Sequence, residues 1–425
     1  MNRKNTARWL GLFAAGLIWA LPAQANDDEA SLRKELDELK TQIDSLKENR
    51  TQRLDQEIEG YLESNGEWTK SAQGEDANSR ITITAGIFAL SQNIVGQESG
   101  LNASVVNGQA EIGFNFNVAE GLDIVTTLFA NTQGHFPSEN PQGATLAGSF
   151  DGIGVDSSVN VRPQGGVQIL EAFIRYAIPA GNATINMEMG LIDPRTRFLT
   201  SAFSDDYRTS FLHNEFVDPS AISWTSSAAG NNVLGLLFTY AFGQNKNFIL
   251  SAGGFNGPGE WFNEMQLYVQ FHWKGEISGR AMNLKLLGVI DNFYTPNGSD
   301  DDDVNWGFEW DWMASDKIGV WVIISGNTEN TNTVEFSWSV GMIYTGIGSR
   351  ADDQFGVGVG SMKANTDVIS VPEDTEYVVE AFYKYMAAGG KFQISPSVQF
   401  ISDPGGGTFD KSSIWLLSIR FYVPF

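Results

Sequence analysis

From residue 81 to the last residue, apolar and polar residues alternate along this chain with the period of two that a β-strand imposes. The clearest segment is 304–312, VNWGFEWDW, in which apolar residues such as Trp306 alternate with small or polar ones such as Glu309. Segments 109–118 and 334–344 repeat the pattern. The alternation predicts an all-β structure with two distinct faces on each strand.

The pattern divides into about sixteen strands, an even number, as bacterial single-chain membrane barrels require. We expect them near 81–90, 109–118, 122–131, 167–178, 183–191, 233–242, 247–255, 264–273, 280–290, 304–314, 317–326, 334–344, 354–361, 376–386, 391–401 and 413–425.

Short connections, such as 119–121 and 243–246, alternate along the chain with long ones, such as 132–166 and 192–232. This rhythm is typical of a transmembrane β-barrel, which has short turns on one side of the membrane and long loops on the other. The apolar faces are rich in Trp, Phe and Tyr near strand ends, as in the aromatic girdles of such barrels. A water-soluble β-sandwich would not require either feature. We therefore predict an antiparallel transmembrane β-barrel of about sixteen strands.

The first residues have the pattern of an export signal. A basic stretch that includes Arg3 and Arg8 precedes the apolar run 9–21, and Ala23-Gln24-Ala25 supplies a small-x-small cleavage pattern. The apolar run is short for a membrane-spanning helix, which needs about 20 residues. We expect residues 1–25 to be a cleaved signal peptide, as suits a protein of the outer membrane.

Residues 26–63 have a different periodicity. Leucine and isoleucine recur at alternating spacings of four and three, the seam of a coiled coil, and the repeat then slips near residue 54. A single polar helix of this length is marginal in water, so the pattern favours self-association, and a homotrimer would match the oligomer that many porins form. An unpaired spacer helix is the alternative. Residues 64–80 break the periodicity and are expected to be a linker.

Composition narrows the possible functions. The chain has no cysteine, which excludes disulfides and thiolate chemistry, and its formal charge of −24 argues against nucleic acid as a partner. The three histidines are scattered, and the acidic run Asp300 to Asp303 lacks the spaced ligands of an EF-hand loop. No grouping of nucleophile and base is visible. We expect no enzyme activity, no metal and no cofactor.

The C-terminal segment is the most specific single feature. In 413–425, SIWLLSIRFYVPF, every second residue from Trp415 to Phe425 is apolar, and the chain ends on that phenylalanine. A terminal amphipathic strand that ends on an aromatic residue resembles the signal read by the outer-membrane assembly machinery. We expect Phe425 to be part of that signal.

Two stretches resemble the carbohydrate-selective, OprB-type porins. One is 187–222, MEMGLIDPRTRFLTSAFSDDYRTSFLHNEFVDPSAI, which is similar to a strand followed by that family's inward loop. The other is 376–425, with EYVVEAFYKY, the QFISDPGG element and the terminal strand. The resemblance implies a sixteen-stranded barrel in outer-membrane lipid through which sugars or similar small hydrophilic solutes diffuse.

If the aromatic faces meet lipid, the opposite faces line the pore, and charged side chains there set its field. The segment 171–176, EAFIRY, matches 380–385, EAFYKY, so that acid and base sit four apart on one strand face in both. Structural ion pairs that only hold the wall together are the alternative. The residues expected on the pore wall are Glu171, Arg175, Glu309, Asp311, Glu380, Lys384 and Arg420.

The segment 192–232 would be the third long loop, which in general porins folds inward to narrow the channel. It mixes charged groups with aromatic residues, a combination that suits sugar hydroxyls and ring faces but also an ordinary surface loop. The candidate constriction residues are Arg195, Arg197, Asp205, Asp206 and Arg208.

Two functions remain open from the sequence. A passive channel for small solutes is favoured by inner faces rich in Gly, Ser, Asn and mixed charges. A structural anchor or adhesin, whose barrel only tethers the coiled coil, is the alternative. If all the inward acids met water, the wall would be net negative, and a modest cation preference that fades with salt would follow.

Overall fold

The computed structural model describes residues 81–95, 104–131, 166–224, 233–256, 265–291, 303–328, 332–366, 375–387, 390–407 and 413–425. The expected signal peptide, coiled coil and linker, and the acidic run 300–302, lie outside the described residues. No helix among the described residues is long and apolar enough to cross a membrane.

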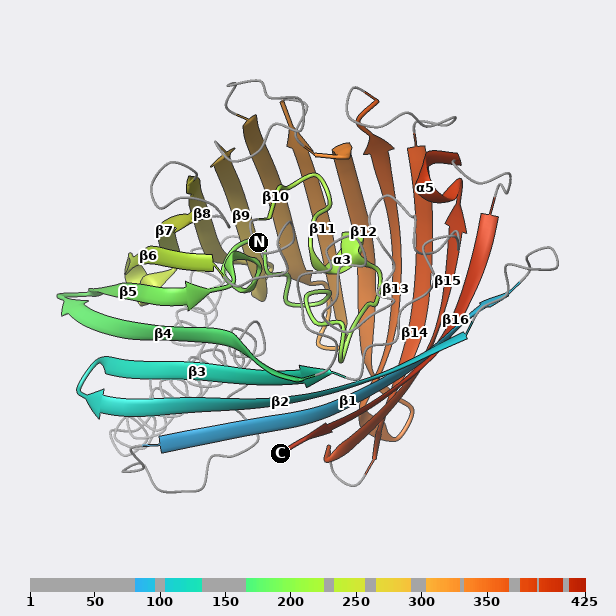
Figure 1. Cartoon of the computed structure of the whole chain (residues 1–425), viewed down its shortest axis with the longest axis horizontal. Coiled ribbons are helices and arrows are strands. Elements are labelled where there is room, and N and C mark those ends of the chain that lie inside the picture. Colours follow the sequence, from blue (N-terminus) through green and yellow to red (C-terminus); the bar gives the residue numbers. More distant parts are fainter. Residues whose placement is uncertain are drawn as a thin grey trace, which may run out of the picture. The chain divides into compact units, whose positions relative to one another are not determined.

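Sixteen strands form a closed antiparallel barrel, in which each strand pairs with the next and β1 pairs with β16 (Figure 1). The predicted sixteen-stranded barrel is confirmed. The strands are β1 (Ile81–Val95), β2 (Ser104–Ala119), β3 (Leu122–Asn131), β4 (Gly166–Ala180), β5 (Ala183–Ile192), β6 (Val233–Phe242), β7 (Phe248–Asn256), β8 (Met265–Ile277), β9 (Arg280–Asp291), β10 (Asp303–Met313), β11 (Ile318–Asn327), β12 (Val334–Ile347), β13 (Arg350–Ala364), β14 (Thr375–Ala387), β15 (Phe392–Ser402) and β16 (Ser413–Pro424).

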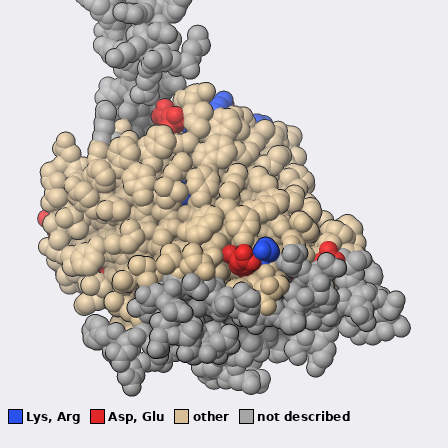
Figure 2. All heavy atoms as spheres, turned by 90° about the horizontal axis from the view of Figure 1, so that it is seen from above, with Lys and Arg blue, Asp and Glu red and all other residues tan. Residues whose placement is uncertain are grey.

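The alternation in the sequence corresponds to the two faces of the barrel wall. On β16, Trp415 and Leu417 are exposed on the outside, whereas Leu416 and Arg420 are buried on the inside. The outer wall seen in Figure 2 is almost free of charged residues between its two rims. Such an apolar band is what a lipid bilayer requires of a spanning wall.

Register shifts in β2, β4 and β12 interrupt this alternation locally, and those near Glu171 and Glu335 affect charged residues. Glu171 pairs with Thr127 and Ile169 with Leu128, so that Leu170 is the extra residue in β4. In β12 the extra residue is Glu335. Because a bulge moves the neighbouring side chains to the other face, the expected positions at this end of β12 are wrong. Val334 is buried rather than outward, and Glu335 lies at the rim, half-exposed in an ion pair with Lys363.

The connections at the two ends of the barrel differ as expected. Tight turns join β2 to β3, β4 to β5 and the later even-numbered strands to their successors, as at Gly121 and Gly181, which both have positive φ. Longer segments connect the strands at the opposite end. One of them, between β5 and β6, lies inside the ring of strands with the short helix α3 (Asn214–Val217) (Figure 1). We call its described part, residues 193–224, the inserted loop.

The hydrophobic core lies between the barrel's inner wall and the inserted loop. Phe198, Leu199, Ile222 and Trp224 of the loop pack in one cluster with wall residues such as Tyr268. In a second cluster, Leu212 of the loop packs against Phe88, Leu90 and Phe129. The loop is therefore held in the lumen by apolar burial, the dominant favourable term in folding.

Candidate functional site

Glycines on the inner wall make room for the inserted loop. A side chain on Gly307 of β10 would collide with Leu199, and one on Gly319 of β11 would collide with Phe203. A Cβ atom on Gly358 of β13 would lie 3.0 Å from Phe211. Glycine allows such close approach because it has no Cβ. The inner glycines, expected to face the pore, here receive large side chains of the loop.

Wall carboxylates also hold the backbone of the inserted loop. Glu380 accepts hydrogen bonds from the backbone N–H groups of Leu212 and His213, at 2.9 Å each. Asp311 accepts one from the N–H of Ala202 at 2.9 Å and one from the hydroxyl of Ser201 at 2.8 Å. A hydrogen bond to a charged acceptor is stronger than one between neutral groups. Asp311 on β10 and Glu380 on β14 therefore hold two separate parts of the loop against the wall.

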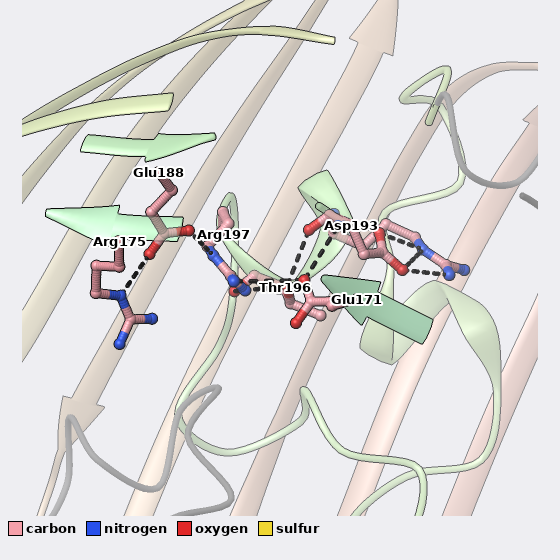
Figure 3. Close-up of polar contacts among 7 residues, drawn as sticks. Glu171, Arg175, Glu188, Asp193, Thr196 and Arg197 are labelled. Carbon is pink, nitrogen blue, oxygen red and sulfur yellow. Dashed lines mark hydrogen bonds and ion pairs between the residues drawn. The ribbon is translucent and has the colours of Figure 1, made fainter. Parts of the chain in front are cut away.

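A chain of alternating charges runs from β4 and β5 onto the start of the loop (Figure 3). The Nε atom of Arg175 lies 2.9 Å from Glu188, and Glu188 also contacts the Nε atom of Arg197 at 2.8 Å. Arg197 in turn lies 3.3 Å from Glu171. Both guanidinium groups lie over the ring of Phe173, at 5.5 Å and 5.1 Å from its centroid. We call these five residues the charge ladder.

The charge ladder continues through the backbone of the loop. The N–H of Asp193 donates to Glu171 at 3.1 Å. Asp193 caps the short 3-10 helix η2 (Pro194–Thr196) and binds the Arg195 guanidinium at 2.7 Å. Asp218 lies 3.7 Å from the same guanidinium. Burial alone would lower the pKa of Arg195, but Asp193 and Asp218 raise it above its ordinary value. Arg195 therefore keeps its positive charge in the inserted loop.

A second cluster forms where the middle of the loop meets β2. Arg208 pairs with Glu111 at 3.1 Å and with Asp206 at 2.8 Å. The hydroxyl of Tyr207 donates to Gln109 at 3.0 Å. The carbonyl of Tyr207 accepts from Arg420 on β16 at 2.7 Å, which links this part of the loop to the strand that closes the barrel.

Three titratable groups lie in or beside the helical turn of the loop. His213 caps α3 through Nδ1, and burial lowers the pKa of its ring to about 3, so it is neutral. Burial raises the pKa of Glu215 to about 7, although the backbone N–H of Ser220 donates a hydrogen bond to it at 3.1 Å. Burial likewise raises the pKa of Asp218 to about 6, against the opposing effect of Arg195. At neutral pH His213 is therefore uncharged and Glu215 is partly protonated, whereas Asp218 keeps most of its charge beside Arg195.

The structure separates the expected pore residues into two groups. Glu171, Arg175, Arg195, Arg197, Asp206 and Arg208 keep part of their side chains accessible, and Asp205 and Lys384 are also only partly buried. Glu309, Asp311, Glu380 and Arg420 are fully buried. Alternation alone therefore does not identify the positions that meet water, because the loop covers part of the inner face.

The buried group includes a compact ion pair. Lys285 on β9 lies 2.8 Å from Glu309 on β10 and also donates to the carbonyl oxygen of Thr200 in the loop. A buried charge needs such compensation because desolvation is costly. Glu309 therefore belongs to the part of the inner wall that the loop covers, and not to a part that is exposed to water.

Phe173 and Gln109 belong to the site but were not singled out from the sequence. Phe173 lies midway between Glu171 and Arg175, so the period-two pattern places all three on one face. Gln109 begins the segment that carries Glu111 and shares its face. Among the described residues, no group of three or more His, Cys, Asp or Glu side chains is placed to hold a metal ion.

Comparisons with known proteins agree with this architecture. The carbohydrate-selective porin family OprB matches residues 63–421. A structure of Pseudomonas putida OprB superposes with a TM-score of 0.65 at 13% sequence identity, over 81% of this chain and 94% of that one. A mutant of a Rhodopseudomonas blastica porin superposes with a TM-score of 0.50 at 14% identity, over 81% and 100% of the two chains. No curated protein matches the sequence. The chain belongs to the OprB family of carbohydrate-selective porins and is a channel of the bacterial outer membrane for small solutes.

Proposed function

We propose that neutral sugars diffuse through this barrel past the charge ladder and the inserted loop, which together form its constriction. The observation that supports the proposal most directly is the position of the loop, which lies inside the ring of strands and carries the partly accessible side chains of Arg195 and Arg197. Guanidinium and carboxylate groups in fixed positions offer donors and acceptors to sugar hydroxyls.

The internal pairing of the charge ladder explains why such binding would be weak. The carboxylate of Glu188 already accepts from both Arg175 and Arg197. Only the remaining donor and acceptor positions are available to a passing solute. A channel needs this balance, because binding must favour entry and still permit release.

The selectivity expected from the sequence changes with this geometry. Glu309, Asp311 and Glu380 are buried and cannot act on channel water as exposed charges. The partly accessible charges of the constriction are mixed in sign, with Arg197 near Glu171 and Glu188 and Arg195 near Asp193 and Asp218. We propose that the cation preference is weak at any salt concentration and that neutral solutes pass regardless of it.

The double substitution Arg195→Ala and Arg197→Ala tests the constriction. We expect a stronger cation preference, since Glu171 and Glu188 lose Arg197 while Asp193 and Asp218 lose Arg195. Larger sugars should pass faster because two long side chains are removed. Reversal potentials in a salt gradient and swelling of liposomes in sugars of increasing size provide the two measurements. Lys363→Ala, which removes a half-exposed cation paired with Glu335 at the rim, is the matched control. If the double variant keeps the ion selectivity and the sugar size limit of the wild type, the loop lies outside the conduction path. If the wild type itself shows no conductance, the anchor function is favoured instead.

We further propose that the channel is a homotrimer and that residues 26–63 associate as a coiled coil. The support is the apolar seam that begins at Leu32 and continues to Leu46. The full chain should be trimeric in detergent by analytical ultracentrifugation, and deletion of 26–63 should weaken the trimer. An identical distribution of species for both proteins would show that the segment does not contribute to assembly.

A further inference from the structure

Basic residues recur at the short turns of the barrel, although the whole chain carries a net charge of −24. Short turns of outer-membrane barrels face the periplasm, so these residues lie near the periplasmic leaflet. Five successive turns between β6 and β15 each contain or adjoin one, and these residues are Lys246, Arg280, Lys317, Arg350 and Lys391.

Two of these cations lie on either side of the same turn. The Nζ atom of Lys317 donates to the carbonyl oxygen of Gly346 at 3.1 Å. A Cβ atom on Gly346 would lie 3.4 Å from that Nζ atom and 3.6 Å from the carbonyl oxygen of Ala351, next to Arg350. Lys317 therefore contacts the end of β12, and Arg350 begins β13 on the other side of the β12–β13 turn.

Each cation lies over a tyrosine ring of the outer wall. Lys317 lies 5.9 Å from the ring centre of Tyr344, and Arg350 lies 4.0 Å from that of Tyr385. Tyr344 shares the even-numbered outer face of β12 with Val340, which is 40% exposed. Tyr385 shares the odd-numbered outer face of β14 with Val379, which is 39% exposed. The cations therefore lie at the interface between the membrane and the periplasm, where aromatic side chains gather in membrane proteins.

Arg350 is held in a fixed orientation. Its Nε atom lies 2.6 Å from the buried carboxylate of Asp353, and its Nη2 atom donates to the carbonyl oxygen of Met386 at 2.5 Å. Asp353 is itself oriented by Tyr383 and by the N–H of Met386. Lys317 differs, because among the described residues its ammonium forms no ion pair with a carboxylate. The neighbouring Asp316 pairs instead with Arg280.

We propose that Lys317 and Arg350 bind the phosphate of a glycerophospholipid in the periplasmic leaflet of the outer membrane. A phosphate at Lys317 would receive donors from its ammonium group, and Arg350 at the start of β13 would add a second positive charge on the same rim, since phosphate suits an arginine fork and a lysine point charge. The acyl chains would lie along the apolar outer residues above the site, such as Val340 and Phe355. This surface is on the outside of the barrel, so the inference is independent of sugar passage.

The test uses the full protein, released in a mild detergent and titrated with dioleoylphosphatidylglycerol, with bound lipid counted by native mass spectrometry. Lys317→Gln leaves the contacts of Asp353 intact and should weaken lipid binding roughly fivefold, the effect of one interfacial cation. The additional change Arg350→Gln should weaken it by a similar factor. Dioleoylglycerol, which lacks the phosphate, should bind the wild type and both variants equally.

Lys363→Gln provides the matched control, since Lys363 is a half-exposed cation at the opposite rim. The proposal is supported if this control keeps the affinity of the wild type while Lys317→Gln loses it. It is overturned if Lys317→Gln binds the phospholipid as the wild type does, or if the control loses as much affinity. Heat-modifiable mobility on gels verifies that each variant contains a folded barrel.

Discussion

Deletion of Phe425, or its replacement by Asp, is expected to abolish assembly of the barrel in the outer membrane. Phe425 continues the pairing of the last strand with the first, because its N–H donates to Ala85 at 2.7 Å and its carbonyl accepts from Ala85 at 3.1 Å. Its ring is exposed on the lipid side of the wall. Deletion therefore removes both the end of the closing seam and an apolar group that meets the bilayer, and the Asp replacement exchanges that apolar group for a charge. Quantifying folded, heat-modifiable protein in outer-membrane fractions measures the effect.

A conservative replacement separates the terminal signal from general damage to β16. Phe425→Tyr keeps an aromatic ring and the backbone pairing, so near-normal amounts of folded barrel should result. Wild-type levels of the Asp variant would contradict a role of the terminal aromatic residue in assembly. Equal loss in the Tyr and Asp variants would show that the machinery reads more than aromatic character.

The barrel could be predicted from the sequence because each strand is specified by the alternation of apolar and polar residues within its own segment. Every strand alternates with period two, and the two faces of β16 follow directly from the order of Trp415, Leu416 and Leu417. The prediction failed where the alternation is interrupted, as at Glu335, since the extra residue of a bulge has no distinctive residue type. Periodicity describes a regular strand and cannot locate its irregularities.

The position of the inserted loop against the inner wall could not be predicted, because it depends on contacts between residues that are far apart in the sequence. Glu380 and Leu212 are 168 residues apart, and Asp311 and Ala202 are 109 residues apart. The sequence placed both acids on the inner face but could not show what lies over that face. The charge ladder was partly accessible to prediction because Glu171 and Arg175 belong to one strand and Arg197 follows the next one closely.

Removal of the two acids that hold the loop is expected to widen the channel. In the double variant Asp311→Ala and Glu380→Ala, the N–H groups of Ala202, Leu212 and His213 lose their acceptors. Each orphaned donor costs on the order of 1–3 kcal/mol while it stays buried. The loop can relieve that cost by leaving the wall and exposing these groups to channel water. We expect larger and noisier single-channel currents in planar bilayers, with an increased size limit for sugars.

Matched variants distinguish release of the loop from a simple loss of charge. Glu380→Gln keeps an oxygen that can accept from Leu212 and His213, so the conductance should stay close to that of the wild type. Glu335→Ala removes an acid at the rim, where its carboxylate pairs with Lys363, and should also leave the conductance unchanged. If Glu380→Gln alone opened the channel as widely as the double Ala variant, the charge of Glu380, rather than its acceptor oxygens, would hold the loop. If the double Ala variant conducted as the wild type does, the apolar contacts of Leu199, Phe203 and Phe211 with the glycines of the wall would be sufficient to keep the loop in place.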